Sequence, residues 1–237
     1  MGTSIKPTGF EHAAAALRYW TRRQEIVANN LANVDTDGFK GEQSFAQLLE
    51  GVAGPVAGAA TDLRAGTITQ TGQAFDLAIQ GNGFFVVATP QGDKLSRGGS
   101  LALDGDGRIV DARGHALQGD RGPLQIPLHA AKVEIDAAGE VRADGHSVGR
   151  LRVERPADGA TLTHAGDTLF TASATTNVED GARQVRQGAR ESSNVNPLEA
   201  MVDMITIQRA TGGVQKALAT LDAARGIAVS EIGKSAS

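Results

Sequence analysis

Apolar side chains recur at alternating steps of three and four residues near both ends of the chain. The first series runs from Phe10 to Val34, and the second begins after Pro197 and runs from Leu198 to Ile232. Steps of three and four bring side chains to one face of an α-helix, and sustained heptads of this kind are typical of coiled coils. Because helices of this length are marginal alone in water, we expect the two apolar seams to bury each other or to be buried by another chain.

The middle of the chain follows a different pattern, in which short apolar runs alternate with glycine-containing turns. Strands are predicted at Phe75–Ile79, Gly83–Val87 and Leu151–Glu154, with a turn at Gly81–Asn82. The stretch from 51 to 66 is rich in alanine and glycine and predicts an irregular linker. The fold class that follows is α+β: terminal helices paired as a coiled coil, a central all-β domain and an irregular linker region.

These patterns divide the chain into five segments. We expect an N-terminal helix of the coiled-coil core domain (1–35), an extended linker (36–79), a β-rich outer domain (80–175), a return linker (176–196) and a C-terminal helix of the core domain (197–237). The net charge is +1 for residues 1–40, 0 for residues 195–237 and −5 for the remainder. Nearly neutral ends can be crowded together with little mutual repulsion, which favours assembly through the helices.

Composition narrows the classes of function. The formal net charge of −4 gives no reason to expect a nucleic-acid partner. No apolar run approaches the roughly 18 residues that span a bilayer, so we expect no direct membrane insertion. The chain has no cysteine, which excludes disulfides, zinc–thiolate sites and cysteine nucleophiles. The apolar stretch Ala13–Leu17 is too short for a secretory signal, so we expect any export to proceed without a cleaved signal peptide.

The motifs that could carry chemistry are weak. Gly81–Gly83 follows a predicted strand, as a dinucleotide loop would, but Val86 stands where the third glycine belongs, so a hairpin turn is favoured. Asp104–Gly107 is similar to part of a calcium loop, but the later carboxylates are missing and a hairpin turn is again favoured. The five histidines are far apart in sequence. We therefore expect no catalytic residue, no cofactor and no metal site.

Three stretches are not explained by helix or strand formation alone, namely Asn29–Lys40, Asp76–Phe85 and Glu191–Pro197. The first places three asparagines on the last turns of a helix, where they are unfavourable by propensity. Their presence is explained if their side-chain amides form hydrogen bonds to the backbone or to neighbouring helices. Gly38 can adopt the left-handed conformation that ends the helix. The third stretch carries serine and asparagine side chains suited to capping a helix N-terminus.

Together these stretches resemble the flagellar rod and hook family. The resemblance consists of an Asn-Asn-Leu-Ala-Asn helix end, a Thr-x-Gly-Phe-Lys segment, an Asp-Leu-Ala-Ile-x-Gly-x-Gly-Phe-Phe segment, an Arg-x-Gly-Ser segment before an Asp-x-x-Gly turn, and a Ser-Asn-Val-Asn entry to the last helix. These lie at Asn29–Asn33, Thr36–Lys40, Asp76–Phe85, Arg97–Ser100, Asp104–Gly107 and Ser193–Asn196. The short connection after Lys40 is more like that of members from the proximal part of the rod, with a distal member as the alternative.

The resemblance implies a structural subunit, not an enzyme, that assembles through its terminal helices into the tubular drive shaft around the export channel. Its partners would be copies of itself, other flagellar rod proteins and the flagellar export apparatus, and its location the basal-body rod in the periplasm. A secreted β-domain binding module or enzyme is the alternative from another class. An enzyme would need a cleft with convergent titratable groups, and a binding module would remain folded and monomeric without the terminal helices.

We expect the assembly interface to lie on the terminal helices and on the segments that join them to the β domain. Apolar positions of the two seams and the asparagine-rich helix end supply most of it. The residues predicted to form it are Leu17, Asn29, Asn30, Leu31, Asn33, Val34, Gly38, Phe39, Asn194, Val195, Asn196, Met201, Ile205, Val214, Leu218 and Leu221.

Overall fold

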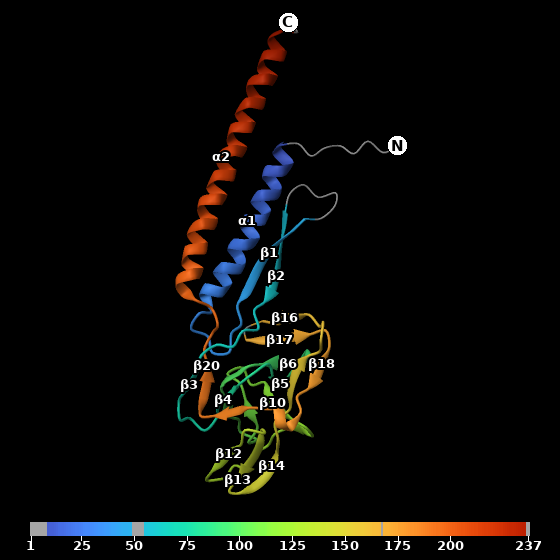
Figure 1. Cartoon of the computed structure of the whole chain (residues 1–237), viewed down its shortest axis with the longest axis vertical. Coiled ribbons are helices and arrows are strands. Elements are labelled where there is room, and N and C mark those ends of the chain that lie inside the picture. The colour runs from blue at the N-terminus through green and yellow to red at the C-terminus, as the bar shows by residue number, and fades with distance from the viewer. Residues whose placement is uncertain (1–8, 49–54, 167, 236–237) are drawn as a thin grey trace, which may run out of the picture. The chain divides into compact units, whose positions relative to one another are not determined.

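The computed structural model describes residues 9–48, 55–166 and 168–235. The first eight residues of the predicted N-terminal segment therefore lie outside the described residues. The chain forms two compact units, which Figure 1 shows. We call residues 1–32, 42–60 and 196–237 the helical unit, and residues 33–41 and 61–195 the β unit. The chain therefore passes from one unit to the other four times.

The helical unit contains two helices and a hairpin. The helices are α1 (Gly9–Ala32) and α2 (Pro197–Ser235), and the hairpin pairs β1 (Glu42–Leu48) with β2 (Pro55–Thr61). Proline at the first position of α2 has no amide hydrogen to leave unsatisfied, and it is pre-set for helical geometry. Within this unit α1 and α2 lie side by side (Figure 1). Among the described residues no helix is long and apolar enough to cross a membrane.

The two helices and the β-rich remainder are compatible with an α+β fold, but the predicted coiled coil is wrong. The residues expected to begin the α2 seam are exposed, since Leu198, Met201 and Ile205 keep 71%, 51% and 50% of their accessible surface. The buried side chains of α2 are instead Ala200 and Ile207. The buried face of α2 therefore differs from the face on which the predicted seam begins.

The error comes from a change of phase along α2. Val214 and Leu218, from the second part of the predicted seam, are half-buried. Nine residues separate Ile205 from Val214, which is about two and a half helical turns, so the two side chains point to opposite sides of the helix. Gly212–Gly213 interrupts the apolar series between them and conceals this change in the sequence.

The irregular linker of the predicted fold class is also wrong. Strand β2 lies within this stretch, and it pairs with the preceding strand β1 in a two-stranded sheet of their own. None of the hairpin residues whose burial is described is fully buried. The hairpin consequently lacks the alternation of apolar and polar residues by which a half-buried strand is recognised in a sequence.

The β unit is built on a ten-stranded antiparallel sheet, in which seven strands follow the order β16-β17-β6-β5-β10-β9-β8, β11 pairs with β10, and β15 joins β5 to β18. Two three-stranded sheets, β12-β13-β14 and β19-β4-β7, and the pair β20-β3 complete the unit. The strands are β3 (Ile68–Gln70), β4 (Asp76–Ile79), β5 (Phe84–Thr89), β6 (Gly92–Ser96), β7 (Gly98–Ser100), β8 (Ala102–Leu103), β9 (Ile109–Val110), β10 (Ala116–Gly119), β11 (Gly122–Pro123), β12 (Val133–Ile135), β13 (Glu140–Ala143), β14 (His146–Arg150), β15 (Val153–Pro156), β16 (Leu162–His164), β17 (Leu169–Ala172), β18 (Thr175–Asn177), β19 (Val185–Gln187) and β20 (Ala189–Glu191).

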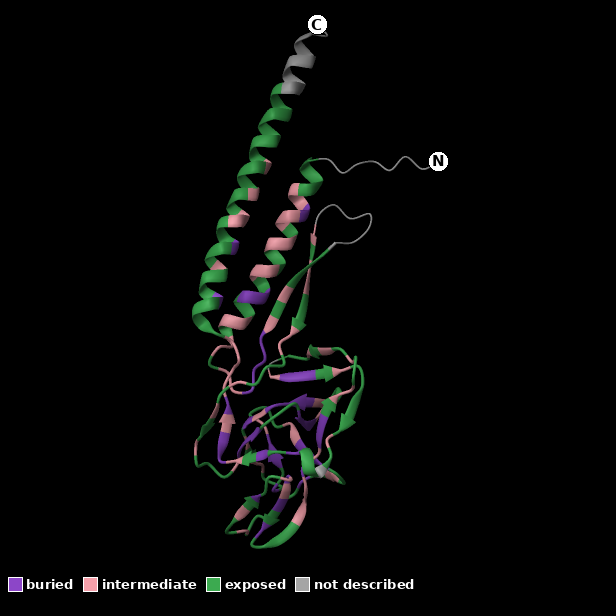
Figure 2. Ribbon diagram, viewed as in Figure 1, coloured by how far each residue is buried: buried purple, intermediate pink, exposed green. Residues whose placement is uncertain are grey.

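Strands β4, β5 and β15 each overlap one of the three predicted strand segments. The hydrophobic core of the β unit includes Leu77, Phe85 and Leu151, each at 0% exposure. Figure 2 shows the contrast between this unit, where buried residues gather, and α2, which is largely exposed. The strand pattern of the sequence therefore encodes a unit that covers its own apolar surface.

The Asp104–Gly107 segment is a hairpin turn, as favoured over a calcium loop. The Asp104 carboxylate accepts hydrogen bonds from the backbone amides of Asp106 at 2.9 Å and Arg108 at 2.8 Å. Gly107 adopts a left-handed conformation with φ of 78°, which glycine tolerates without steric cost. The carboxylate thus holds the turn closed.

Strand β7 approaches β4 so closely that Gly98 leaves no room for a side chain. Gly98 has φ of 90°, and a Cβ atom there would lie 2.2 Å from the carbonyl oxygen of Leu77. Gly92 offers a matched comparison in the same unit, because it has φ of 98° but no atom within 4 Å of its Cβ position.

We predict that Gly92→Ala lowers the free energy of unfolding by about 1–2 kcal/mol, the cost of the left-handed conformation. Gly98→Ala adds a clash with rigid backbone and is expected to cost about 2–5 kcal/mol in total. Urea unfolding of the two variants beside the wild type measures both values. Equal losses for the two variants would show that β4 and β7 can separate without penalty.

Candidate assembly interface and its buried charge cluster

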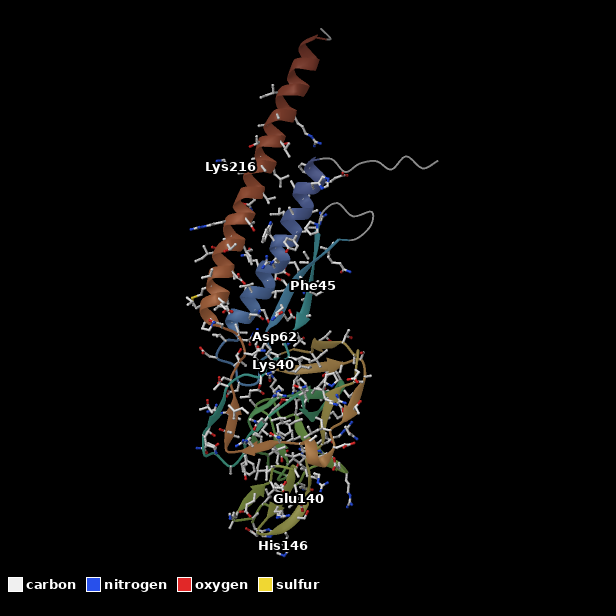
Figure 3. All side chains as sticks on the ribbon, viewed as in Figure 1. Lys40, Phe45, Asp62, Glu140, His146 and Lys216 are labelled. Atoms are coloured by element: carbon white, nitrogen blue, oxygen red, sulfur yellow. The ribbon has the colours of Figure 1, made fainter. Side chains whose placement is uncertain are left out.

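A buried charge cluster joins three distant parts of the β unit. The Nζ of Lys40 lies 2.7 Å from Oε1 of Glu191, and Nε of Arg97 lies 2.7 Å from Oε2 of the same carboxylate. The three side chains retain only 1–2% of their accessible surface. Figure 3 labels Lys40 among the side chains of this unit. One carboxylate thus neutralises part of the charge of two cations away from water.

The guanidinium of Arg97 also fixes the loop between β4 and β5. It donates hydrogen bonds of 2.8 Å to the carbonyl oxygens of Ile79 and Gly81, and a further bond to that of Gly83. Its Cζ lies 5.3 Å from the centre of the Phe84 ring. An arginine, with its five donors in a planar fork, can satisfy a carboxylate and several carbonyls at once, whereas a lysine cannot.

Backbone and amide groups complete the network around Glu191. Its Oε1 accepts a 2.8 Å hydrogen bond from the amide of Gly66, and its carbonyl accepts one of 2.7 Å from the amide of Gly38. Lys40 donates a second bond of 2.7 Å to the carbonyl of Arg64. The residues between α1 and β1, those after β2 and the end of β20 are therefore bonded together inside the β unit.

Asn194 extends this network toward the start of α2. Its Oδ1 accepts from the amide of Gly41 at 2.8 Å, and its Nδ2 donates to the carbonyls of Asp62 and Arg64 at 2.8 and 3.0 Å. Two residues later, Asn196 caps α2, because its Oδ1 accepts from the backbone amide of Leu198 at 3.0 Å.

The electrostatics of the cluster favour the charged carboxylate. Burial acts to raise the pKa of Glu191, but the hydrogen bonds and positive charges of Arg97 and Lys40 outweigh it and hold the pKa of this carboxyl below its ordinary value. Burial lowers the pKa of Lys40, against the opposing effect of Glu191. Loss of the Glu191 charge would leave two buried cations without a counter-ion.

Several predicted interface residues lie inside the β unit and make contacts there. Phe39 is 1% exposed, and its ring stacks on His164 with centroids 5.2 Å apart. Gly38 is buried beside Arg97 with φ of 71°. Asn33, Val34, Asn194 and Val195 are half-buried in the same unit. The structure brings this group together within one chain.

Asn30 is also bonded within the chain. Its Nδ2 donates to the carbonyl of Glu42 at 2.8 Å, and its Oδ1 accepts from the amide of the same residue at 2.9 Å. The amide side chain therefore pairs with β1 as a neighbouring strand would. Nearby, Arg23 donates to Oγ of Ser44 at 3.0 Å, so polar side chains of α1 hold the hairpin.

The remaining predicted residues lie in the helical unit on different faces. Leu17, Leu31, Val214 and Leu218 are half-buried, whereas the following are exposed: Asn29, Asn196, Met201, Ile205 and Leu221. Met201 and Ile205 form a continuous row with Leu198 and Val202, which are 71% and 55% exposed. These four residues are spaced by three, one and three positions, as one helix face requires. We call this row the α2 outer stripe.

Sequence reasoning did not identify Arg97 and Glu191 as partners of Lys40. Lys40 and Glu191 lie in stretches that helix and strand formation left unexplained, and Arg97 begins one of the segments that resemble the rod and hook family; that was the available signal. A second signal was the charge itself, because a charged residue is rarely fully buried unless it is paired. Among the described residues no group of three or more His, Cys, Asp or Glu side chains could hold a metal ion.

Family models match three parts of the chain. Residues 10–40 match the model for flagella basal body rod protein, residues 78–143 that for the flagellar hook protein FlgE/F/G D1 domain, and residues 186–230 that for the flagellar basal body rod FlgEFG protein C-terminal region. Flagellar basal-body rod protein FlgF of Caulobacter vibrioides is 34% identical, over 90% of this chain and 93% of that protein. The chain belongs to the flagellar basal-body rod protein family.

Other rod proteins match over similar lengths. FlgF of Escherichia coli is 29% identical, over 89% of this chain and 92% of its own length. Flagellar basal-body rod protein FlgG of Bacillus subtilis is 30% identical, over 88% of this chain and 92% of its own. The rod and hook resemblance read from the sequence motifs is confirmed, and the chain is FlgF-like.

For this rod protein we predict that Glu191→Gln lowers the free energy of unfolding by about 3–5 kcal/mol at neutral pH, because two buried cations lose their counter-ion. The folded-state pKa of Glu191 is depressed, so its contribution is present above the ordinary value of 4.5 and is lost as the pH falls through the folded value. The difference in the free energy of unfolding between wild type and variant should therefore become smaller in acid. Urea unfolding at a series of pH values measures it.

Glu134→Gln is the matched control, since Glu134 pairs with Lys132 at the surface with 52% of its side chain exposed. Exposed pairs contribute about 0–1 kcal/mol, so this variant should unfold almost as the wild type does. Similar losses in the two variants would show that the buried cluster contributes no more to stability than a surface ion pair does.

Asn30→Asp keeps the size of the side chain but replaces the amide donor by an oxygen facing the Glu42 carbonyl. We expect the free energy of unfolding to fall by about 1–3 kcal/mol, because α1 loses a hydrogen bond to β1. Amide hydrogen exchange in that strand should become faster. His12→Asp adds a carboxylate to an exposed position of the same helix and should leave β1 unchanged. Unaltered exchange in Asn30→Asp would mean that other contacts hold the hairpin.

Proposed function

We propose that this rod protein is a structural subunit of the proximal part of the flagellar rod, and that it assembles through its terminal helices into the tubular shaft around the export channel. Its partners in the proposal are copies of itself and other rod proteins. The observation that carries the proposal is the α2 outer stripe, whose members Leu198, Met201, Val202 and Ile205 remain 50–71% exposed.

A row of four large apolar residues is costly to leave in water. Full burial of one such side chain is worth about 1.5–3 kcal/mol, so a neighbouring subunit that covers the row gains a substantial part of its binding energy there. Exposed apolar residues that are grouped in this way mark interaction surfaces, whereas isolated ones do not. The half-buried predicted residues Val214 and Leu218 lie on the other side of the helix and do not belong to this surface.

The exposed members of the predicted interface remain part of the proposal. They are Asn29 on α1, Asn196 at the start of α2, and Met201, Ile205 and Leu221 along α2. The remaining predicted residues contribute indirectly, by shaping the two units that carry the interface.

Export and location are part of the same proposal. We infer that the subunit crosses the cytoplasmic membrane through the flagellar export apparatus and assembles in the periplasm. A chain without cysteine suits an oxidising compartment, since no stray thiol can form unwanted disulfides. A packing role, not catalysis, accounts for the paired state of the buried Lys40, Arg97 and Glu191 side chains.

A position in the distal rod is the second candidate. It is favoured by the match to FlgG of Bacillus subtilis, whose 30% identity is close to the 34% of FlgF from Caulobacter vibrioides. Complementation separates the two positions, because the chain should restore motility to cells that lack their FlgF and not to cells that lack their FlgG. The reverse result would place it in the distal rod.

We predict that Ile205→Asp abolishes rod assembly and motility while leaving the subunit folded. The charge would be buried without a partner once a neighbour covers the stripe, but it stays in water in the free subunit. Gln215→Asp, at an exposed position of α2 away from the stripe, is the control and should assemble. Motility and the yield of isolated basal bodies are the measurements, and normal rods from Ile205→Asp would remove the stripe from the interface.

A further inference from the structure

The loop between β4 and β5 contains a dipeptide that is chemically reactive. Asn82 precedes Gly83, and no other asparagine of the chain precedes a glycine. Asn82 is exposed, so water reaches it. An Asn-Gly sequence is prone to deamidation, because a glycine has no side chain to hinder its own amide nitrogen when that nitrogen attacks the asparagine side chain.

The reaction at this dipeptide has two steps. In the first, the deprotonated amide nitrogen of Gly83 attacks Cγ of Asn82, a C–N bond forms, and the side-chain nitrogen leaves as ammonia. In the second, water opens the resulting five-membered succinimide ring. Opening at Cγ gives aspartate, whereas opening at the backbone carbonyl gives isoaspartate, in which the main chain runs through Cγ. Either product is reached with water consumed and ammonia released, and neither step needs an oxidant or a cofactor.

The folded loop opposes the first step. Arg97 donates hydrogen bonds to the carbonyl oxygens of Gly81 and Gly83, so one guanidinium holds the backbone on both sides of Asn82. Gly83 is also closely packed, since a Cβ atom there would lie 2.8 Å from Cγ1 of Val153. The succinimide ring closes only from a narrow range of backbone and side-chain angles. A mobile chain reaches these angles easily, whereas this loop must first open against its contacts.

We propose that Asn82 is a deamidation site which the folded β unit protects through Arg97, and which is open to the reaction while the chain is unfolded. Isoaspartate is the more disruptive product, because it inserts one additional backbone atom between the two carbonyls that Arg97 binds. The guanidinium then cannot meet both carbonyls and Glu191 in their present geometry. A chain modified before it folds should therefore form the buried charge cluster poorly. The inference stands apart from the proposed rod function, since it rests on contacts within the β unit.

The first test compares the deamidation rate of Asn82 in the folded and unfolded full-length chain. Purified protein is held at mildly alkaline pH with or without guanidinium chloride, and mass spectrometry of its peptides follows the exchange of NH2 for OH. A synthetic Gly-Asn-Gly-Phe peptide in both buffers corrects for the effect of the denaturant on the chemistry. We expect the corrected rate to be about tenfold or more higher in the unfolded chain. Equal rates would overturn the protection, and an unmodified Asn82 in the unfolded chain would overturn the site.

Arg97→Lys tests which group protects the loop. Lysine keeps a positive charge beside Glu191, but it cannot bond to several carbonyls at once. Arg108→Lys is the matched control, because Arg108 is a surface arginine that pairs with Asp104 in a different turn. We expect deamidation several-fold faster than in the wild type for folded Arg97→Lys and at the wild-type rate for Arg108→Lys. The same rate in both variants would overturn the role of Arg97.

A further measurement needs no change at Arg97. Wild-type chain modified in denaturant is refolded, and its isoaspartate content is determined with an isoaspartate methyltransferase. We expect its unfolding temperature to fall as this content rises. Asn82→Asp, treated in the same way, is the control and should keep its unfolding temperature, because it carries the carboxylate at an exposed position without the additional backbone atom. An unchanged unfolding temperature in the modified wild type would overturn the link to the buried charge cluster.

Discussion

The β unit depends on a single buried carboxylate. Glu191 receives Lys40 and the Gly66 amide on one oxygen and Arg97 on the other, so loss of this carboxylate would leave two cations unpaired away from water. Removing one partner of a buried ion pair costs far more than the pair contributes to stability, because the remaining ion stays desolvated without a counter-ion. The network therefore acts as a constraint on how three distant segments meet, more than as a source of net stability.

That constraint falls on the segments where the chain enters and leaves the β unit. The backbone around Gly38 and Lys40 precedes β1, the backbone around Arg64 follows β2, and Glu191 and Asn194 lie just before α2. Hydrogen bonds with fixed donors and acceptors define one register for these segments, whereas apolar packing alone would allow several. A subunit that must join many neighbours gains from this, since each copy then presents the same connections to its helices.

Periodicity predicted both helices and strands such as β4, β5 and β15, because these follow from local patterns that a sequence displays directly. It failed at Gly212–Gly213, where two apolar series on opposite faces of α2 read as one. It also failed for β1 and β2, since a hairpin without a buried face leaves no alternation to read. The pairing of Lys40 with Glu191 spans 151 residues and is set by tertiary structure, so only the unusual motifs around both residues pointed to it. The turn at Asp104, by contrast, was readable from its Asp-x-x-Gly spacing.

The two apolar faces of α2 explain why the helix is so long and so exposed. One face, with Ala200 and Ile207, is covered within the chain, while the outer stripe, with Met201 and Ile205, is not. A monomer that evolved to remain alone would place polar residues on the second face, because exposed apolar rows promote association. The β unit shows that the chain can bury a large apolar core within itself. In the proposed function, the exposed stripe is half of a contact whose other half belongs to another subunit.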